Sequence, residues 1–389
     1  MATGLKIFDD FSGDEYYVDY QNGSDAVGLS QGLTPSNAFQ TIKYAVETGM
    51  PHYGLNTTNG VRFNLLNNAT HVVSSEIDVS SLAGRTAYVV RVQFVGCTSA
   101  ANDGGYATIS VASSTKLMDT GEDSLDFGFL DISGDNNGVI LNIDRYSSLR
   151  EVRVVNNSTA GQAYALNTGS GTSLINCHLE SYSTSSVRTQ GSNIEVMRNC
   201  VAINRGAGGA AQKGSKAIGS LFIQLGSSPN QTLLSESTDV INCGFLFAGT
   251  PTAQYAFQVG QNTRLVCGNY IQGAYNGIKL GNNCRAEVFG NSQYGIINTH
   301  IDSTDTNIFN TPQREALYTQ TSALYPDVSS GDYTLTGTPD HDRVVGNVGW
   351  NGATAVTTVY QNVIGLSRAL PSGGGGSTVQ TVASIERLK

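Results

Sequence analysis

The chain has 389 residues, a formal net charge of −9 and only 14% charged side chains, so its surface must consist mainly of neutral polar groups. It has no cluster of Lys and Arg that could form a basic surface for nucleic acid. No apolar run reaches the length of about 20 residues that a membrane span needs, and "MATGLKIFDDFSG" lacks the apolar run of a secretory signal. We therefore expect a protein made in the cytoplasm, with neither nucleic acid nor a membrane among its partners.

Residues 1–50 predict an opening strand followed by one short amphipathic helix. The strand-like "YYVDYQNGSD" comes before "SNAFQTIKYAVETG", which has apolar residues at helical spacing. Ser36 or Asn37 could cap the start of the helix, and Gly49 could end it. The apolar stripe consists of Ala38, Ile42, Ala45 and Val46. This helix is expected to cover the first turn of whatever fold follows it.

Residues 51–300 carry an internal repeat of about 22 residues, visible in "SLINCHLES", "EVMRNCVAIN", "DVINCGFLF" and "RLVCGNYIQ". Short β-branched strands separated by Gly and Asn turns at this period predict coils of about three strands, stacked as a parallel β-helix. One inward-facing column is expected to contain Ile109, Ile132, Val155, Cys177, Cys200, Phe222, Cys243, Cys267 and Phe289. A second column is expected at a tight bend, where carboxamides tolerate a left-handed backbone and bond their neighbours above and below. That second column contains Asn176, Asn199 and Asn242.

The cysteines have no CxxC pair and no His at zinc-ligand spacing, so no metal site is predicted. Neighbouring turns would bring Cys177 near Cys200 and Cys243 near Cys267, within the range of a disulfide. The favoured interpretation is that the thiols fill a narrow core as small apolar groups.

Residues 301–370 are expected to form closing strands and loops, with Trp350 as an end plug. Residues 371–389 then give a Gly-rich linker, "PSGGGGST", and a tail. Apolar residues recur every three positions in that tail, which could dock on a partner as a short helix or remain disordered. They are Val379, Val382, Ile385 and Leu388.

"YYVDYQNGSD" with "GLSQGLTPSNAFQTIKYAVE" resembles the opening segment of right-handed parallel β-helix proteins of the pectate-lyase-like superfamily, and "LINCHLE" resembles their coil repeat. Proteins of this kind include bacteriophage virion proteins and tailspikes. The resemblance implies an all-β, right-handed parallel β-helix solenoid with an N-terminal capping helix. It implies no single activity, because the superfamily includes polysaccharide lyases, glycoside hydrolases, tailspikes and structural modules.

The glycan-cleaving members that the chain resembles use either acidic clusters that bind calcium or paired carboxylates as general acid and base. The best acidic column in this sequence is Asp135, Asn157 and Glu180. Its two carboxylates would lie two turns apart, about 9 to 10 Å, near the upper end of inverting-hydrolase spacing. The favoured interpretation is that both are solvated turn residues. No catalytic residue and no cofactor is therefore assigned, and calcium has no supporting motif.

Other features are weaker candidates for chemistry. The segment "PDHDR" at residues 339–343 places acid, imidazole and guanidinium groups together at positions 340–343, but in a loop-like context. The Gly-rich "RGAGGAAQKGSK" has Ser215 where a phosphate-binding loop needs its Lys. Scattered tyrosines could present platforms for sugar rings or protein partners, or simply pack at strand edges. They include Tyr164, Tyr182, Tyr255, Tyr270, Tyr275 and Tyr294.

A rigid solenoid without an export signal indicates a bacteriophage virion protein on the particle exterior, as a capsid decoration or a tailspike-like adhesin. Its expected partners are other virion proteins and surface glycans, and homotrimers are what the resemblance to phage spikes implies. The alternative is a depolymerase, meaning a polysaccharide lyase or glycoside hydrolase acting on bacterial or algal polysaccharide. The low charge content favours the structural role over an enzyme.

Overall fold

The structure is a computed structural model that divides into two compact units, Met1–Leu179 and Glu180–Lys389. It describes Phe11 and residues 13–26, 31–49, 60–79, 91–101, 103–119, 125–143, 145–161, 163–182, 194–206, 216–226, 234–237, 239–249, 255–260, 265–281, 287–289, 291–298, 301–303, 317–319, 322–324 and 328.

The described part of the first unit contains strands and one helical segment near its N-terminus. The helical turns are η1 (Pro35–Asn37), α1 (Ile42–Tyr44) and η2 (Ala45–Gly49). The strands are β1 (Asp14–Val18), β2 (Val61–Leu66), β3 (His71–Val73), β4 (Val92–Cys97), β5 (Ala107–Val111), β6 (Met118–Asp119), β7 (Leu125–Gly134), β8 (Val139–Ile143), β9 (Ser148–Asn156), β10 (Tyr164–Thr168) and β11 (Thr172–Ile175). Strand β12 (His178–Ser181) lies at the boundary between the units.

The described part of the second unit contains strands only. They are β13 (Ile194–Arg198), β14 (Val201–Asn204), β15 (Lys216–Ile218), β16 (Leu221–Gln224), β17 (Leu234–Ser237), β18 (Asp239–Ile241), β19 (Gly244–Phe247), β20 (Tyr255–Val259), β21 (Leu265–Cys267), β22 (Tyr270–Gln272), β23 (Asn276–Leu280), β24 (Glu287–Phe289), β25 (Asn291–Tyr294), β26 (Ile301–Ser303) and β27 (Leu317–Thr319).

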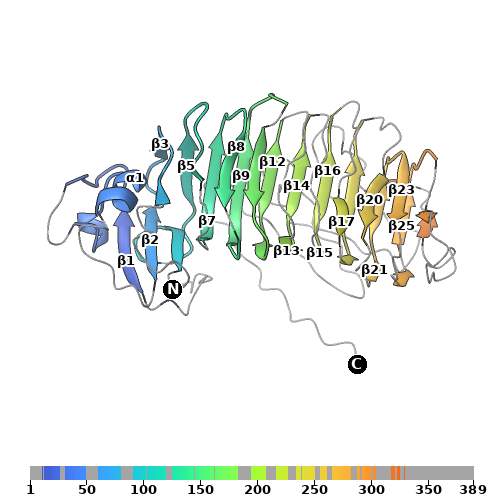
Figure 1. Cartoon of the computed structure of the whole chain (residues 1–389), viewed down its shortest axis with the longest axis horizontal. Helices are drawn as coiled ribbons and strands as arrows, with labels where there is room; N and C mark the ends of the chain where they lie inside the picture. The colour runs from blue at the N-terminus through green and yellow to red at the C-terminus, as the bar shows by residue number, and fades with distance from the viewer. Residues whose placement is uncertain are drawn as a thin grey trace. The chain divides into compact units, whose positions relative to one another are not determined.

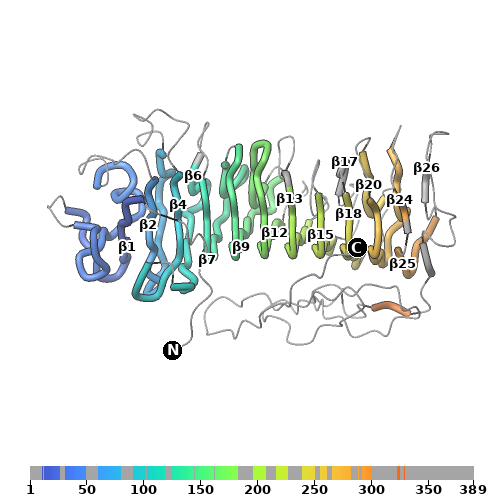
Figure 2. The backbone as a smooth tube through the Cα atoms, turned by 90° about the horizontal axis from the view of Figure 1, so that it is seen from below, coloured from blue at the N-terminus to red at the C-terminus, as the bar shows by residue number. Residues whose placement is uncertain are grey.

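Each unit is a parallel β-solenoid. In the first unit β1, β2, β4, β7 and β9 pair in that order, all parallel, and lie side by side (Figure 1). In the second unit β15, β18, β21 and β24 form one parallel row, and β16, β19, β22 and β25 form another (Figure 2). The prediction of an all-β parallel β-helix with a helix near its N-terminus is confirmed. Parallel pairing continues past residue 300, because β26 pairs with β23 and β27 with β25.

Aromatic side chains stack along the core of each unit. In the first unit Tyr16, Phe63, Phe94 and Phe127 follow one another, with ring centroids 6.0, 5.2 and 5.4 Å apart. In the second, the Phe222 and Phe245 centroids are 5.1 Å apart. Stacking at coil spacing removes large apolar surfaces from water on every turn, and this burial drives folding.

The predicted core column is correct at its first step, from Ile109 to Ile132, and at its last, from Cys267 to Phe289, but it shifts between them. Ile109 pairs with Ile132, as expected, but Ile132 then pairs with Val154, and Val155 pairs with Ser133. A shift of one residue moves a side chain to the other face of a strand. Val155 therefore belongs to a different column from Ile132.

The second unit also separates positions that the sequence placed in one column. Phe222 pairs with Phe245, whereas Cys243 precedes Gly244, the partner of Leu221. Cys267 pairs with Ile241 on one side and with Phe289 on the other. Phe222, Cys243 and Cys267 thus lie in three columns. Coils of unequal length and a bend between successive strands break the constant spacing.

That bend is a left-handed residue, which recurs in four successive coils of the second unit. Asn199, Gly219, Asn242 and Gly268 have φ of 53°, 58°, 54° and 65°. The first three donate their backbone N–H to the next coil, to the carbonyls of Ile218, Ile241 and Cys267, each at 2.9 Å. The expectation of left-handed Asn is confirmed, also at Asn176 with φ of 57°. The expected amide ladder is wrong for Asn242, because register places Gly219 and Gly268 beside it.

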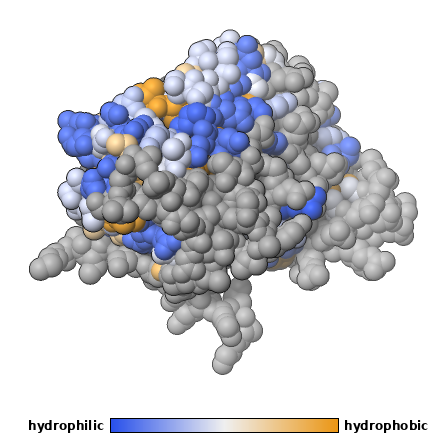
Figure 3. Space-filling model, turned by 60° about the vertical axis from the view of Figure 1, so that its left-hand side comes forward, coloured by the Kyte–Doolittle hydropathy of each residue, from blue (hydrophilic) through white to orange (hydrophobic). Residues whose placement is uncertain are grey.

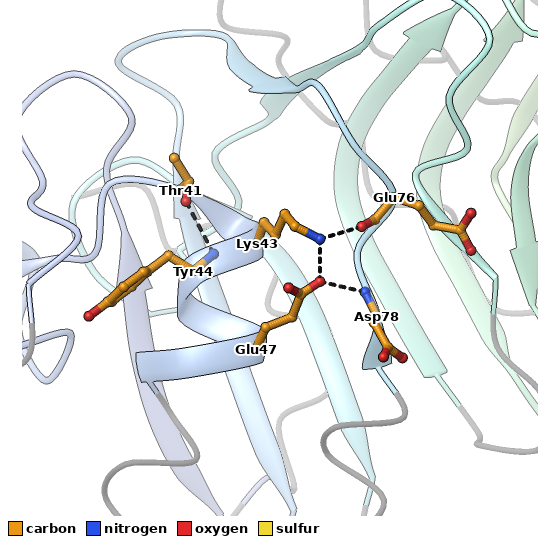
Figure 4. A network of polar contacts seen from close by, with 6 residues as sticks. All are labelled: Thr41, Lys43, Tyr44, Glu47, Glu76 and Asp78. Atoms are coloured by element: carbon orange, nitrogen blue, oxygen red, sulfur yellow. Dashed lines mark hydrogen bonds and ion pairs between the residues drawn. The ribbon is translucent and has the colours of Figure 1, made fainter.

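The helical segment packs against the first coil, but it begins later than predicted. Thr41, rather than Ser36 or Asn37, caps it by accepting a hydrogen bond from the Tyr44 N–H at 3.1 Å (Figure 4). Pro35 lies in a separate 3₁₀ turn, and Phe39 pairs with β1, so the chain is extended just before the helix. The Phe39 N–H donates to the Tyr17 carbonyl at 2.9 Å, and its carbonyl accepts from the Asp19 N–H at 2.8 Å.

A polar clasp ties the helical segment to the loop after β3. Lys43 Nζ donates to Glu47 Oε1 and to the Glu76 carbonyl, both at 2.6 Å (Figure 4). Glu47 Oε1 also accepts from the Asp78 N–H at 2.8 Å. Because one carboxylate joins the helix to the loop, the clasp holds the helical segment on the first unit.

All five cysteines that the structure describes are buried, and none of them forms a disulfide. Burial raises the pKa of the Cys243 thiol to about 12 and that of Cys267 to about 11. Thiols of this kind are protonated at neutral pH and unreactive. The interpretation of these cysteines as core-filling groups is confirmed.

Candidate functional site

The two acidic candidates, Asp135 and Glu180, belong to different units and have different surroundings. Asp135 is exposed on the turn after β7. The Glu180 side chain is only 6% exposed and pairs with the Nε of Arg205, whose guanidinium carbon lies 5.4 Å from the centre of the Tyr182 ring. The structure thus leaves Asp135 on an exposed turn and gives Glu180 an ion-pair partner.

The C-terminal candidates lie outside the residues that the structure describes. These are the "PDHDR" segment, Trp350, and the predicted docking residues Val379, Val382, Ile385 and Leu388. Within the described ranges, no group of three or more His, Cys, Asp or Glu could hold a metal ion. No helix in those ranges is long and apolar enough to cross a membrane.

Ion pairs join adjacent coils at matching register positions. Asp131 pairs in register with Arg153, and Oδ1 lies 2.9 Å from Nη1. Lys216 pairs in register with Asp239 in the second unit, with Nζ 3.5 Å from Oδ2. Opposite charges directly across neighbouring strands stabilise their pairing, so these groups serve the stacking of coils.

A polar network crosses four coils on one face of the first unit. Arg62 donates through Nη1 to Glu15 Oε1 at 3.0 Å and through Nε to Gln93 Oε1 at 2.9 Å. Gln93 donates to Asp126 Oδ2 at 3.2 Å, and Arg91 pairs with the same oxygen. Burial raises the pKa of Asp126, although Arg91 and Gln93 oppose this. Sequence reasoning missed the network, because its members are 31 and 33 residues apart instead of about 22.

A buried glutamate occupies the left-handed bend of the first unit. Glu151 has φ of 58° and is 3% exposed, and the preceding coil places Phe129 at the same bend with φ of 53°. Glu151 accepts hydrogen bonds from Tyr106 Oη at 2.8 Å and from Asn176 Nδ2 at 3.1 Å. The left-handed backbone costs a residue other than Gly about 1 to 2 kcal/mol. Strained residues of this kind often mark functional positions.

Most tyrosines that the sequence suggested as platforms are packed against the protein. Tyr164 and Tyr270 are buried, so neither can stack on a ligand. The ring of Tyr255 lies 5.4 Å from Lys279 Nζ, and Tyr182 lies against Arg205. Tyr275 and Tyr294 are half-buried. The packing alternative is therefore correct for Tyr164 and Tyr270.

The exposed aromatic residue is one that sequence reasoning did not select. Tyr146, in the turn between β8 and β9, is 72% exposed and has φ of 58°. Its N–H donates to the Ser170 carbonyl of the next coil at 2.9 Å. Its ring lies over Gly171, where a Cβ would come within 2.6 Å of Tyr146 Cδ1. Gly171 was the one indication in the sequence near this turn, because its φ of 77° is a conformation that only Gly adopts readily.

The described residues on one face of the molecule give it a mainly polar surface. On the face in Figure 3, the described residues are mostly hydrophilic or intermediate, with small apolar areas between them. Surfaces of this kind suit ligands that form many hydrogen bonds. Comparison of the chain with protein-family models, with curated proteins and with solved structures found no match.

Proposed function

We propose that the chain is a structural β-solenoid on the exterior of a bacteriophage particle, where it acts as a rigid scaffold that binds surface glycans. The observation that carries this proposal is the pairing of opposite charges at matching positions of neighbouring coils, as between Asp131 and Arg153. Charged groups used in this way hold coils together. An enzyme that cleaves polysaccharides would instead need carboxylates arranged around a substrate.

The low charge of the chain supports a scaffold that meets neutral, hydroxyl-rich partners. A solenoid also suits a particle exterior, because stacked coils give a stiff surface whose stability adds up coil by coil. The proposal includes assembly of the chain as a homotrimer, and contact of this trimer with other virion proteins. Light scattering from the purified full chain would give its mass in solution, and a monomer would remove the trimer from the proposal.

Two measurements test the proposal. Peptide mass spectrometry of purified phage particles should find the chain among the virion proteins, and its absence from particles would refute the virion role. The purified chain should also bind members of a panel of bacterial capsular and exopolysaccharides, with or without calcium, without shortening them.

Loss of polymer size would establish the depolymerase alternative in place of the scaffold. Glu151 and Tyr106 would then be the first residues to substitute, because they combine a buried carboxylate, a hydroxyl at 2.8 Å and a strained backbone. Glu180 would be a weaker choice, since Arg205 neutralises it.

A further inference from the structure

Tyr146 combines strong exposure with a backbone conformation that is unfavourable for its side chain. It is 72% exposed, with φ of 58°. A left-handed position normally selects Gly or Asn, and aromatic residues there are rare. An exposed ring buries little apolar surface, so hydrophobic burial contributes little to the choice of Tyr at this position.

The neighbouring coil supports the ring from below. Gly171 leaves room for the ring, because any larger residue would place its Cβ 2.6 Å from Cδ1 and 2.8 Å from Cε1 of Tyr146. The backbone hydrogen bond from the Tyr146 N–H to the Ser170 carbonyl, at 2.9 Å, fixes the turn that carries the ring. One side of the ring therefore rests on the backbone while most of the side chain meets solvent. A ring held in this way needs no ordering when a ligand arrives.

We infer that Tyr146 is a platform on which a pyranose ring of a surface glycan stacks. The inference rests on the proposed glycan binding and assigns it a position. Sugar rings combine apolar C–H faces with hydroxyl groups, and a tyrosine ring offers an apolar face with a polar tip. Arg145, next to Tyr146 in the chain, is exposed, and its guanidinium can donate hydrogen bonds to sugar hydroxyls.

A protein partner is a poorer fit to the same surface. Protein interfaces need a contiguous patch with several buried anchors. The other large hydrophobic residues that are exposed in the described ranges come from separate segments of the chain. They are Leu33, Val72 and Ile297. A single aromatic ring surrounded by polar groups suits a sugar better than a protein.

The test uses the full chain and two substitutions at Tyr146, with the same panel of bacterial capsular and exopolysaccharides, now immobilised. Tyr146→Asn removes the ring but suits the left-handed backbone, so its melting temperature should equal or exceed that of the unchanged protein. Its affinity for the bound glycan should fall about tenfold, the effect of one lost stacking contact. Tyr146→Phe keeps the ring and should bind within about twofold. Ile297→Asn, a matched loss of an exposed apolar group, should bind normally.

Three results would overturn the inference. If Tyr146→Asn binds as tightly as the unchanged protein, the platform is wrong while the proposed glycan binding stands. If Tyr146→Phe loses as much affinity as Tyr146→Asn, the hydroxyl group is what matters and stacking is not the contact. If the unchanged protein binds no glycan in the panel, both this inference and the glycan-binding part of the proposed function fall, while the virion role is still decided by particle composition.

Discussion

Asn242 provides a direct test of the left-handed bend as a determinant of stability. Its φ is 54°, and its N–H donates to the Cys267 carbonyl at 2.9 Å. Its Oδ1 is buried without a hydrogen-bond partner, so the side chain contributes no bond through that atom. Asn is therefore favoured here chiefly because it tolerates the backbone conformation.

Replacing Asn242 by Ala should lower the free energy of unfolding by about 1 kcal/mol, because Ala pays the cost of a left-handed backbone that Asn partly avoids. Asn242→Gly removes that cost but adds freedom to the unfolded chain, so its effect should lie within about 0.5 kcal/mol of zero. Asn199 lies two coils away, with Gly219 between them. Asn199→Ala and Asn242→Ala should therefore add, to about 2 kcal/mol.

Urea unfolding followed by far-ultraviolet circular dichroism measures these differences in the full chain. Gly219→Ala serves as a matched control, since it introduces the same strain at the bend between the two asparagines and should also cost about 1 kcal/mol. If the Ala and Gly variants of Asn242 unfold at the same urea concentration, backbone strain at the bend does not explain the residue.

Three further predictions follow from the ion pairs and the buried carboxylates. Arg205→Met should lower the free energy of unfolding by about 2 kcal/mol, because it leaves the Glu180 carboxylate buried without its partner. The loss should be smaller than for a fully buried pair, since the Arg205 side chain is 30% exposed. Adding Glu180→Gln should restore most of the lost stability in the same urea assay. Burial tends to raise the pKa of Asp103, but hydrogen bonds from four backbone N–H groups hold it below its usual value. The carboxylate therefore contributes stability above about pH 4 that disappears as the pH falls through the lower folded-state pKa. Asp103→Asn should reduce the stability that is lost as the pH is lowered from about pH 5, and an unchanged dependence of stability on pH would count against the hydrogen bonds as its cause. Glu47→Ala should lower the free energy of unfolding by about 1 kcal/mol and accelerate amide hydrogen exchange at Asp78. Lys43→Met should lower the free energy of unfolding by about 0.5 kcal/mol, since the Lys43 side chain is 41% exposed. Equal exchange rates in both variants would show that the clasp does not hold the helical segment.

The architecture was predictable because stacked coils force residues of one type to recur at one spacing. The runs around Cys200 and Cys243 each contain an apolar strand, a left-handed Asn and a second strand. This order of residues makes the coil recognisable in the sequence. Their period of about 22 residues excluded most other folds. The left-handed backbone of Asn199 and Asn242 was predictable for the same reason.

The exact side-chain columns could not be predicted, because the register of each strand depends on the number of residues in the turns of its coil. Val154 rather than Val155 aligns with Ile132, a difference of one residue that no periodicity resolves. The network through Arg62 and Asp126 escaped notice for a related reason, since its coils are longer than the average. Tyr146 was missed because exposure and a positive φ leave no pattern in apolar spacing.

The position of Phe39 on the outer edge of β1 covers part of a strand edge that could otherwise pair with another chain. Phe39 satisfies one carbonyl and one N–H of that edge, through Tyr17 and Asp19, before the chain turns into the helical segment. A chain cut before residue 50 would instead present β2 with its full row of donors and acceptors uncovered. An uncovered edge strand can pair with a strand of another chain. Removal of the N-terminal segment should therefore increase self-association, seen as an apparent mass in solution that rises with protein concentration.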